Sequence, residues 1–181
     1  MSYLSKILIR LKGLRKEQIF SIIALMIPIN IYIIGDFLGA GFQTSLFKFQ
    51  ISSYGSSFIL VTRDLSYVIS GIYKGQTALS TLLWVIGVCF LVSSIFILFL
   101  ESGASDNLKK RSGTLIIIAG ILFISSIIVQ YGPFFHGPAG TAIPIGLPVL
   151  FVIGGWMYME GRKEEVGDEV QEVQGIDEKT G

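Results

Sequence analysis

The residues that could do chemistry in this chain are few, and four of them interrupt or border apolar sequence. Asn30 and Asp36 lie within the apolar stretch 19–38, and Thr81 and Gln130 lie near the ends of two later apolar stretches. A polar group in surroundings without water needs a partner inside the protein. Asn30, Asp36, Thr81 and Gln130 are therefore the candidate polar cluster of this sequence.

Other combinations that would indicate an enzyme or a bound ion are missing from the sequence. Cys89 and His136 are the single cysteine and the single histidine, and no acidic residue or cysteine lies near His136. There are no paired carboxylates in apolar sequence, no histidine cluster and no Ser-His-acid arrangement, so we expect no catalytic, metal or cofactor site. We expect structural roles for His136 and for Cys89, the latter as a small packing residue.

The composition indicates how these residues are positioned. The chain has 181 residues, of which 51% are hydrophobic and 15% are charged, whereas a soluble domain carries about 25% charged residues. The charges are absent from four blocks, each about as long as a membrane-spanning helix. We therefore predict an all-α integral membrane protein with four transmembrane helices, at residues 19–38, 78–100, 113–130 and 142–159.

If these blocks are helices, the depth of each polar residue follows from the rise per residue. Asp36 comes about 11 Å outward of its helix midpoint, and Thr81 and Gln130 about 12–13 Å. The half-thickness of the hydrocarbon layer is about 15 Å. The three would then share one level below the outer surface, with Asn30 nearer the centre. Asn30 either fixes helix packing or belongs to a transport site.

The distribution of Lys and Arg predicts the orientation. Basic residues crowd a segment at 1–18 that is amphipathic at helical spacing, the loop 101–112 and the start of an acidic tail at 160–181, whereas the Gly/Pro-rich loop 131–141 has none. The positive-inside rule then places both termini in the cytoplasm, in a multi-pass protein of the cell membrane. The alternatives for the N-terminus are a simple basic flank or a signal peptide cleaved near Gly39.

The segment 41–77 is too polar to span a membrane and too long for a simple turn. Phe47, Phe49 and Ile51 alternate with polar residues, and a turn signal and a β-prone run follow. This predicts a partly β-structured first extracytoplasmic loop with a hairpin of strands at about 46–52 and 57–63. Its aromatic residues form the candidate partner surface, which consists of Phe47, Phe49, Tyr54, Phe58, Tyr67 and Tyr73.

These expectations favour a non-enzymatic membrane protein that serves as an accessory or scaffold subunit of a larger membrane assembly. Its partners would be the lipid bilayer and other membrane subunits, or further copies of itself, and no nucleic acid. The alternative is a small oligomeric channel or transporter that uses Asn30 and Asp36 as polar groups in the membrane.

Overall fold

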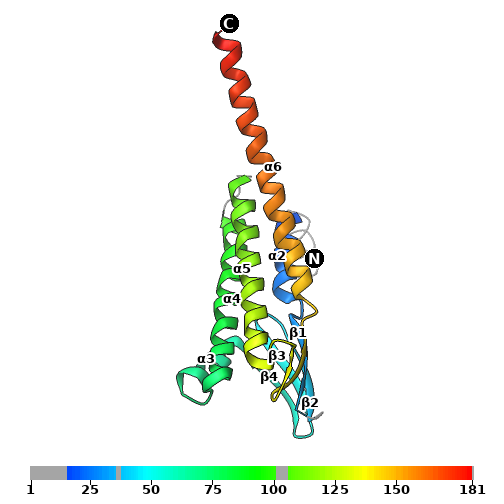
Figure 1. The fold of residues 1–181 in the computed structure, drawn as a ribbon. Coiled ribbons are helices and arrows are strands. Elements are labelled where there is room, and N and C mark those ends of the chain that lie inside the picture. The colour runs from blue at the N-terminus through cyan, green and yellow to red at the C-terminus, as the bar shows by residue number, and fades with distance from the viewer. Residues whose placement is uncertain (1–15, 36–37, 101–105, 181) are drawn as a thin grey trace, which may run out of the picture.

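A six-stranded antiparallel sheet lies at one end of a helix bundle (Figure 1). The computed structural model describes residues 16–35, 38–100 and 106–180. The helices are α2 (Lys16–Met26), α3 (Val61–Ile69), α4 (Gly75–Leu100), α5 (Asp106–Tyr131) and α6 (Leu147–Thr180). The strands are β1 (Asn30–Ile34), β2 (Gly39–Gln43), β3 (Phe47–Ser52), β4 (Gly55–Leu60), β5 (His136–Gly137) and β6 (Gly140–Ile143).

The prediction of an all-α protein with four membrane spans is wrong, and so is the multi-pass description that followed from it. Within the described ranges, two helices are long and apolar enough to cross a membrane, at Gly75–Phe99 in α4 and Asn107–Tyr131 in α5. The other two apolar stretches are each divided between a helix and a strand of the sheet. Stretch 19–38 forms most of α2 and then β1, and stretch 142–159 contains the end of β6 and the first part of α6.

Proline explains where the first of these stretches changes structure. Pro28 disfavours helical geometry at the residue before it and removes a backbone donor, so α2 ends at Met26. The residues that follow, Asn30–Ile34, include three isoleucines and a tyrosine, which favour a strand. In the fourth stretch, Pro144 and Pro148 flank the change from β6 to α6.

The sheet joins the two halves of the chain. Its strand order is β4-β3-β2-β1-β6-β5, so β1 pairs with β6, more than a hundred residues later, with Tyr32 opposite Ala142. The hairpin expected at 46–63 corresponds to β3 and β4, which are two strands of this larger sheet. The second strand ends at Leu60 rather than at residue 63, and α3 follows it directly.

Small residues let α4 and α5 pack closely. Ser80, Gly87 and Ser94 recur every seven residues on α4, and Ser112, Ala119 and Ser126 do so on α5. Each outer pair exchanges hydrogen bonds: Ser80 Oγ donates to the Ser126 carbonyl oxygen (2.9 Å) and Ser126 Oγ to that of Ser80 (2.8 Å). Ser94 and Ser112 repeat this exchange at 3.2 and 3.3 Å. We call these six residues the small-residue seam; such seams allow close helix approach in apolar surroundings.

A second close contact joins α5 to α6. A Cβ added to Gly113 would lie 2.6 Å from the Gly154 carbonyl oxygen and 2.6 Å from the Tyr158 nitrogen, both backbone atoms. The core that these contacts enclose contains the buried side chains of Trp84, Leu91, Phe123, Leu150 and Met157. Beyond the bundle α6 continues as a single helix (Figure 1).

Gly113→Ala should destabilise the fold, whereas Gly155→Ala should not. A Cβ at Gly113 forces α5 and α6 apart, and overpacking of this kind costs about 1–3 kcal/mol. A Cβ at Gly155 meets nothing within 4 Å, and replacing a helical glycine with alanine gains about 1 kcal/mol. Thermal unfolding of the two purified variants checks this, and an equal midpoint for both would contradict the packing described.

A polar cavity between the sheet and the helices as candidate functional site

The sheet turns its polar face toward the helices. Asn30, Tyr32, Gln43, Lys48 and Gln50 alternate along β1, β2 and β3 with apolar residues, and all five line one cavity. The reason is the two-residue period of a strand, which sends alternate side chains to opposite faces. Most apolar residues of the same strands therefore point away from the bundle, and Ile34 of β1 is an exception that lines the cavity.

The helices close the cavity from the other side with further polar residues. Its volume is about 210 Å³. Gly41 leaves room for the Tyr32 ring, because a Cβ at Gly41 would lie 2.8 Å from that ring. Tyr32 in turn stacks with Tyr131 at 6.4 Å between ring centroids. The polar residues contributed by α4, α5 and the connection between α3 and α4 are Tyr73, Thr77, Ser80, Thr81, Ser126, Gln130 and Tyr131.

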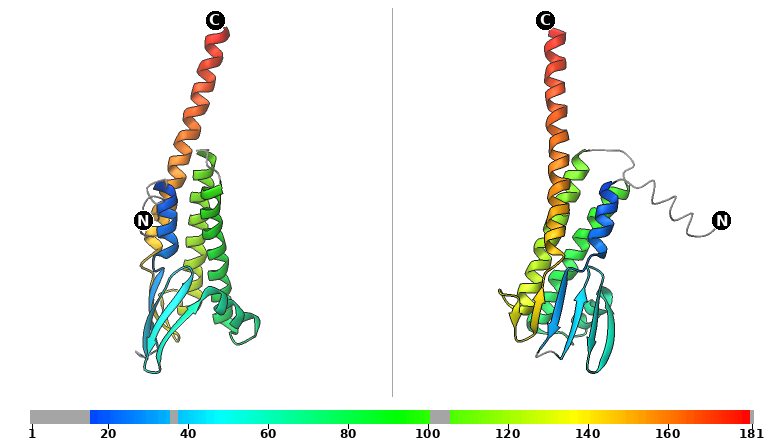
Figure 2. Two further views of the ribbon diagram at one scale, coloured as in Figure 1. Left: turned by 180° about the vertical axis from the view of Figure 1, so that it is seen from behind. Right: turned by 90° about the vertical axis from the view of Figure 1, so that its right-hand side faces the viewer.

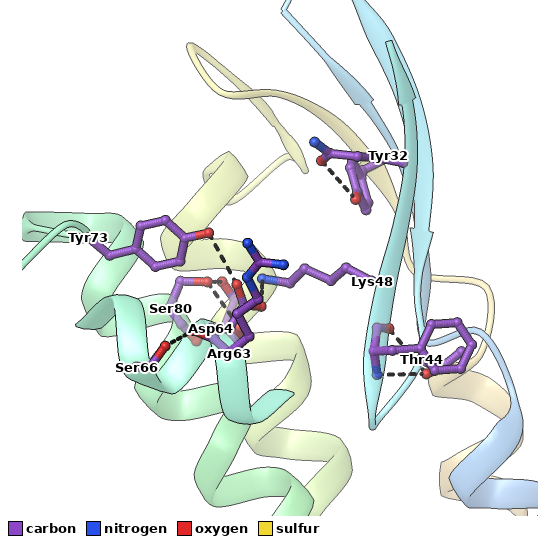
Figure 3. A network of polar contacts seen from close by, with 11 residues as sticks. Tyr32, Thr44, Lys48, Arg63, Asp64, Ser66, Tyr73 and Ser80 are labelled. Atoms are coloured by element: carbon purple, nitrogen blue, oxygen red, sulfur yellow. Dashed lines mark hydrogen bonds and ion pairs between the residues drawn. The ribbon is translucent and has the colours of Figure 1, made fainter. Parts of the chain in front are cut away.

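An ion pair bridges the sheet and α3 beside the cavity. Lys48 extends from β3 and places its Nζ 2.8 Å from Asp64 Oδ2, and the Asp64 side chain is completely buried (Figure 3). The Tyr73 hydroxyl donates to the other carboxylate oxygen at 3.1 Å. Lys48 Nζ also lies 4.5 Å from the ring centroid of Trp84, close enough for a cation–π contact. The charges of the pair thus compensate each other within the protein.

The two tyrosines near this pair keep their protons at neutral pH. Burial raises the pKa of Tyr32 to about 12, and the negative charge of Asp64 adds to the shift. Burial, followed by the charge of Asp64, also raises the pKa of Tyr73 above its ordinary value. Both phenols therefore present neutral hydroxyl groups to their neighbours throughout the physiological pH range.

Two buried polar atoms at this place lack a hydrogen-bond partner within the described part of the chain. They are Asn30 Oδ1 and Trp84 Nε1, on side chains that are each 1% exposed. A buried acceptor or donor left unpaired costs about 1–3 kcal/mol. Asn30 lines the cavity, although its Oδ1 atom is itself buried.

The structure brings three of the four members of the candidate polar cluster together. Asn30, Thr81 and Gln130 line the same cavity, while Asp36 lies outside the described residues. Asn30 lies near Thr81 and Gln130 because it begins strand β1 at the end of the helix bundle. The prediction of a membrane helix had placed Asn30 nearer the centre of the membrane. Residues 1–15 of the basic N-terminal segment predicted at 1–18 also lie outside the described residues.

The six aromatic residues of the candidate partner surface do not form one surface. Phe47, Phe49 and Phe58 lie on the sheet face that points away from the helices, and Tyr54 occupies the exposed turn between β3 and β4. Tyr67 and Tyr73 form a separate edge-to-face pair near α3, at 5.3 Å between centroids.

Sequence reasoning missed Tyr32, Lys48 and Asp64 as parts of the site. The alternation along 47–52 did show that Lys48 and Gln50 share a strand face. It did not show that this face would be the inner one. Nothing in the sequence indicated that Asp64 belongs to the site, because its partner Lys48 lies sixteen residues earlier on a different element.

The single cysteine and the single histidine of the sequence are not part of the cavity lining. Cys89 is exposed on α4 and is not a packing residue within the chain. His136 Nδ1 lies 2.7 Å from Thr141 Oγ1 within the β5–β6 hairpin, where it links the two strands. Among the described residues, no three His, Cys, Asp or Glu side chains lie close enough to hold a metal ion.

Comparison with known proteins adds no family. No protein-family model matches the chain, and no curated protein matches its sequence at a significant level.

Lys48→Met should destabilise the protein strongly, because it leaves the Asp64 carboxylate buried without its cation. Removing one partner of a buried pair costs about 3–5 kcal/mol. Adding Asp64→Asn removes the unpaired charge, so the double variant should be more stable than Lys48→Met alone. Unfolding of the two single variants and the double variant, followed by circular dichroism in detergent, measures this coupling. Additive losses would show that the two side chains do not stabilise each other.

Proposed function

We propose that this protein is a non-enzymatic accessory subunit that is anchored in a membrane by the α4–α5 hairpin. In this proposal it binds another membrane protein through the outward face of its sheet. The observation that carries the proposal is the inverted sheet, which turns polar residues inward and apolar residues outward. We call the outward residues the outer sheet face; they are Ile31, Phe42, Phe47, Phe49, Ile51, Phe58, Leu60 and Ile143.

The dimensions and exposure of the hairpin support the membrane anchor. Each candidate span has 25 residues and is about 37 Å long, whereas the hydrocarbon core is about 30 Å thick. Only 28% and 44% of the most apolar windows in α4 and α5 are buried inside the protein, although the core helix of a soluble protein is mostly buried. Exposed apolar side chains run along α4, at Leu79, Leu82, Ile86, Val92, Phe96 and Phe99.

The charges at the loop end of the hairpin support one orientation. Lys110 and Arg111 lie at the end of α5 that is far from the sheet. Basic residues favour the cytoplasmic side. The sheet and its cavity then lie on the opposite side of the membrane.

The composition of the outer sheet face supports a protein partner. An antiparallel sheet with one solvated face usually turns its apolar face to the core. Here the outward face carries a cluster of phenylalanines, with Phe47 and Phe58 at 4.8 Å and Phe42 and Phe49 at 5.7 Å between centroids. Ile51 and Phe58 are 58% and 53% exposed. Aromatic residues of this kind are enriched at protein interfaces.

The position of the outer sheet face favours an apolar segment of another membrane protein over lipid alone. The face follows directly below α2, whose exposed side includes Phe20 and Ile23 (Figure 2). The far ends of β2 and β3 extend past the ends of α4 and α5 (Figure 1), and Ile51 lies there. Hydrocarbon chains at the depth of the hairpin would not cover that part. A partner that lies along α2 and continues outward would cover all of it.

A small oligomeric channel or transporter is the second candidate, because Asn30 faces a polar cavity at the end of the hairpin. The two candidates differ in which substitutions matter. A subunit depends on the outer sheet face, whereas a channel or transporter depends on the residues that line the cavity.

The orientation predicts which end of the hairpin an impermeant reagent reaches. In a Cys89→Ser background, Gln76→Cys at the start of α4 should react with a membrane-impermeant maleimide on intact cells, and Asn107→Cys at the start of α5 should not. Both residues are exposed and polar, so they are matched. Permeabilised cells provide the control in which both react. Labelling of Asn107→Cys on intact cells would reverse the orientation.

A photo-crosslinking amino acid in place of Phe58 should capture the partner. We expect one discrete adduct with another membrane protein, and this adduct should disappear when Ile51 and Leu60 are both replaced by serine. The same amino acid in place of Ile69, which is 78% exposed near α3, is the matched control and should give no such adduct. An adduct of twice the chain mass would indicate self-association, and adducts with lipid alone would exclude a protein partner; either result contradicts the proposal.

A further inference from the structure

We propose that the polar cavity binds a small, uncharged, polyhydroxylated group. This inference does not depend on the partner proposed for the outer sheet face, because the cavity lies on the opposite face of the sheet. It rests on the charge balance of the cavity, on its supply of donors and acceptors, and on the unpaired oxygen of Asn30.

The charge balance favours a neutral ligand. Lys48 and Asp64 are the charged groups at the cavity among the described residues, and they pair with each other at 2.8 Å. The other polar groups of the lining are amides and hydroxyls, including the phenols of Tyr32 and Tyr73. An ion would lose its hydration and meet only this compensated pair, and burying an unpaired charge is very unfavourable.

The mixture of donors and acceptors favours hydroxyl groups over other neutral groups. Each side-chain amide offers an acceptor and two donors, and each hydroxyl offers both functions. Gln43, Gln50 and Gln130 line the cavity from both sides. A ligand hydroxyl matches such a lining because it donates and accepts at the same atom, whereas a ligand with acceptors alone would leave Asn30 Oδ1 unpaired.

Asn30 is the specific indication that the cavity takes a ligand. Its side chain is 1% exposed, it lines the cavity, and its Oδ1 has no partner among the described residues. A hydroxyl group placed in the cavity reaches this oxygen only if the Asn30 amide turns toward it, because Oδ1 itself is buried. An unpaired buried acceptor is retained at a cost of about 1–3 kcal/mol, and binding would recover this cost.

The size and the apolar parts of the cavity limit the ligand further. Its volume of about 210 Å³ corresponds to about seven molecules of water at roughly 30 Å³ each. It is smaller than the pockets of about 300–1,000 Å³ that hold drug-sized ligands. Ile34, Ile59 and Ile127 interrupt the polar lining, and they suit the C–H faces of a carbon chain or ring. A polyol or a single sugar ring fits this description.

The same chemistry has two possible sources, a free solute and the head group of a lipid. The cavity lies where the hairpin meets the sheet, so either source has access in the proposed orientation. The experiment therefore uses both, with the full-length chain purified in a polyoxyethylene detergent, because a sugar-based detergent would compete for the site.

The binding of myo-inositol and of methyl glucoside tests the proposal. Trp84 is the reporter, since Lys48 lies over its ring beside the cavity, and Trp156→Phe removes the other tryptophan. We expect a saturable change in Trp84 fluorescence with at least one of the two probes, or with vesicles that contain a glucosyl diacylglycerol but not with pure phosphatidylcholine vesicles. The first result identifies a free solute and the second a lipid head group. Inorganic phosphate should give no saturable change.

Three variants locate the binding. Thr81→Val and Gln130→Leu each remove hydrogen-bonding groups from the cavity and should weaken binding, the former about tenfold if one hydrogen bond is lost. Asn30→Leu should weaken it further. Thr114→Val is the matched control, because Thr114 bonds to the Lys110 carbonyl oxygen at the far end of α5, and it should bind normally.

Several results would overturn the proposal. They are the absence of saturable binding to both probes and to the glucolipid vesicles, binding of phosphate that competes with the probes, or equal binding by Thr81→Val and the parent protein. Saturation-transfer NMR with the two probes, which does not depend on Trp84, must agree with the fluorescence. If Asn30→Leu fails to fold, Thr81→Val and Gln130→Leu still decide the result.

Discussion

The small-residue seam between α4 and α5 is the constraint on which the rest of the structure depends. Reciprocal serine pairs close it at both ends, and Gly87 and Ala119 keep the middle narrow. Gly87 leaves room on α4 for the ring of Phe123 on α5, because a Cβ there would lie 2.8 Å from that ring. Trp84 and Phe123 belong to the same buried core as Leu150 and Met157 of α6. The end of the seam at Ser80 and Ser126 also forms part of the cavity wall. The same contact therefore sets the helix spacing and the position of the polar site.

The sheet takes its place from this bundle and has an unusual polarity. Pairing of β1 with β6 holds together segments that follow α2 and precede α6, so the sheet is fixed to the bundle at both ends of the chain. Its inner face then meets the polar ends of α4 and α5, and its outer face carries the phenylalanines. The Lys48–Asp64 pair and the Tyr73 hydroxyl connect this inner face to α3 beside the cavity. The walls of the cavity itself come mainly from the sheet, α4 and α5.

The sequence predicted the two uninterrupted apolar helices and the β3–β4 strands well, because the helices are long apolar runs and the strands follow a two-residue alternation. It failed for the stretches at 19–38 and 142–159, because composition alone does not distinguish an apolar helix from an apolar helix followed by a strand. Pro28 and Pro144 marked the changes, but a proline also kinks a membrane helix without ending it. The pairing of β1 with β6 has no local signal, and without it the inner face of the sheet, Lys48 and Asp64 could not be recognised as a site.

The inverted polarity of the sheet has a consequence for the order in which the chain is made. Strands β1 to β4 leave the ribosome before α4 and α5, and β6 is the last strand of the sheet to follow. Until then, the face that later becomes internal carries Asn30, Gln43, Lys48 and Gln50, which water solvates well. On that face the nascent sheet therefore exposes mainly polar side chains, which do not need to be covered. The opposite face carries the phenylalanine cluster, which is apolar and exposed. This cluster is therefore the part of the nascent chain that most needs a binding partner early.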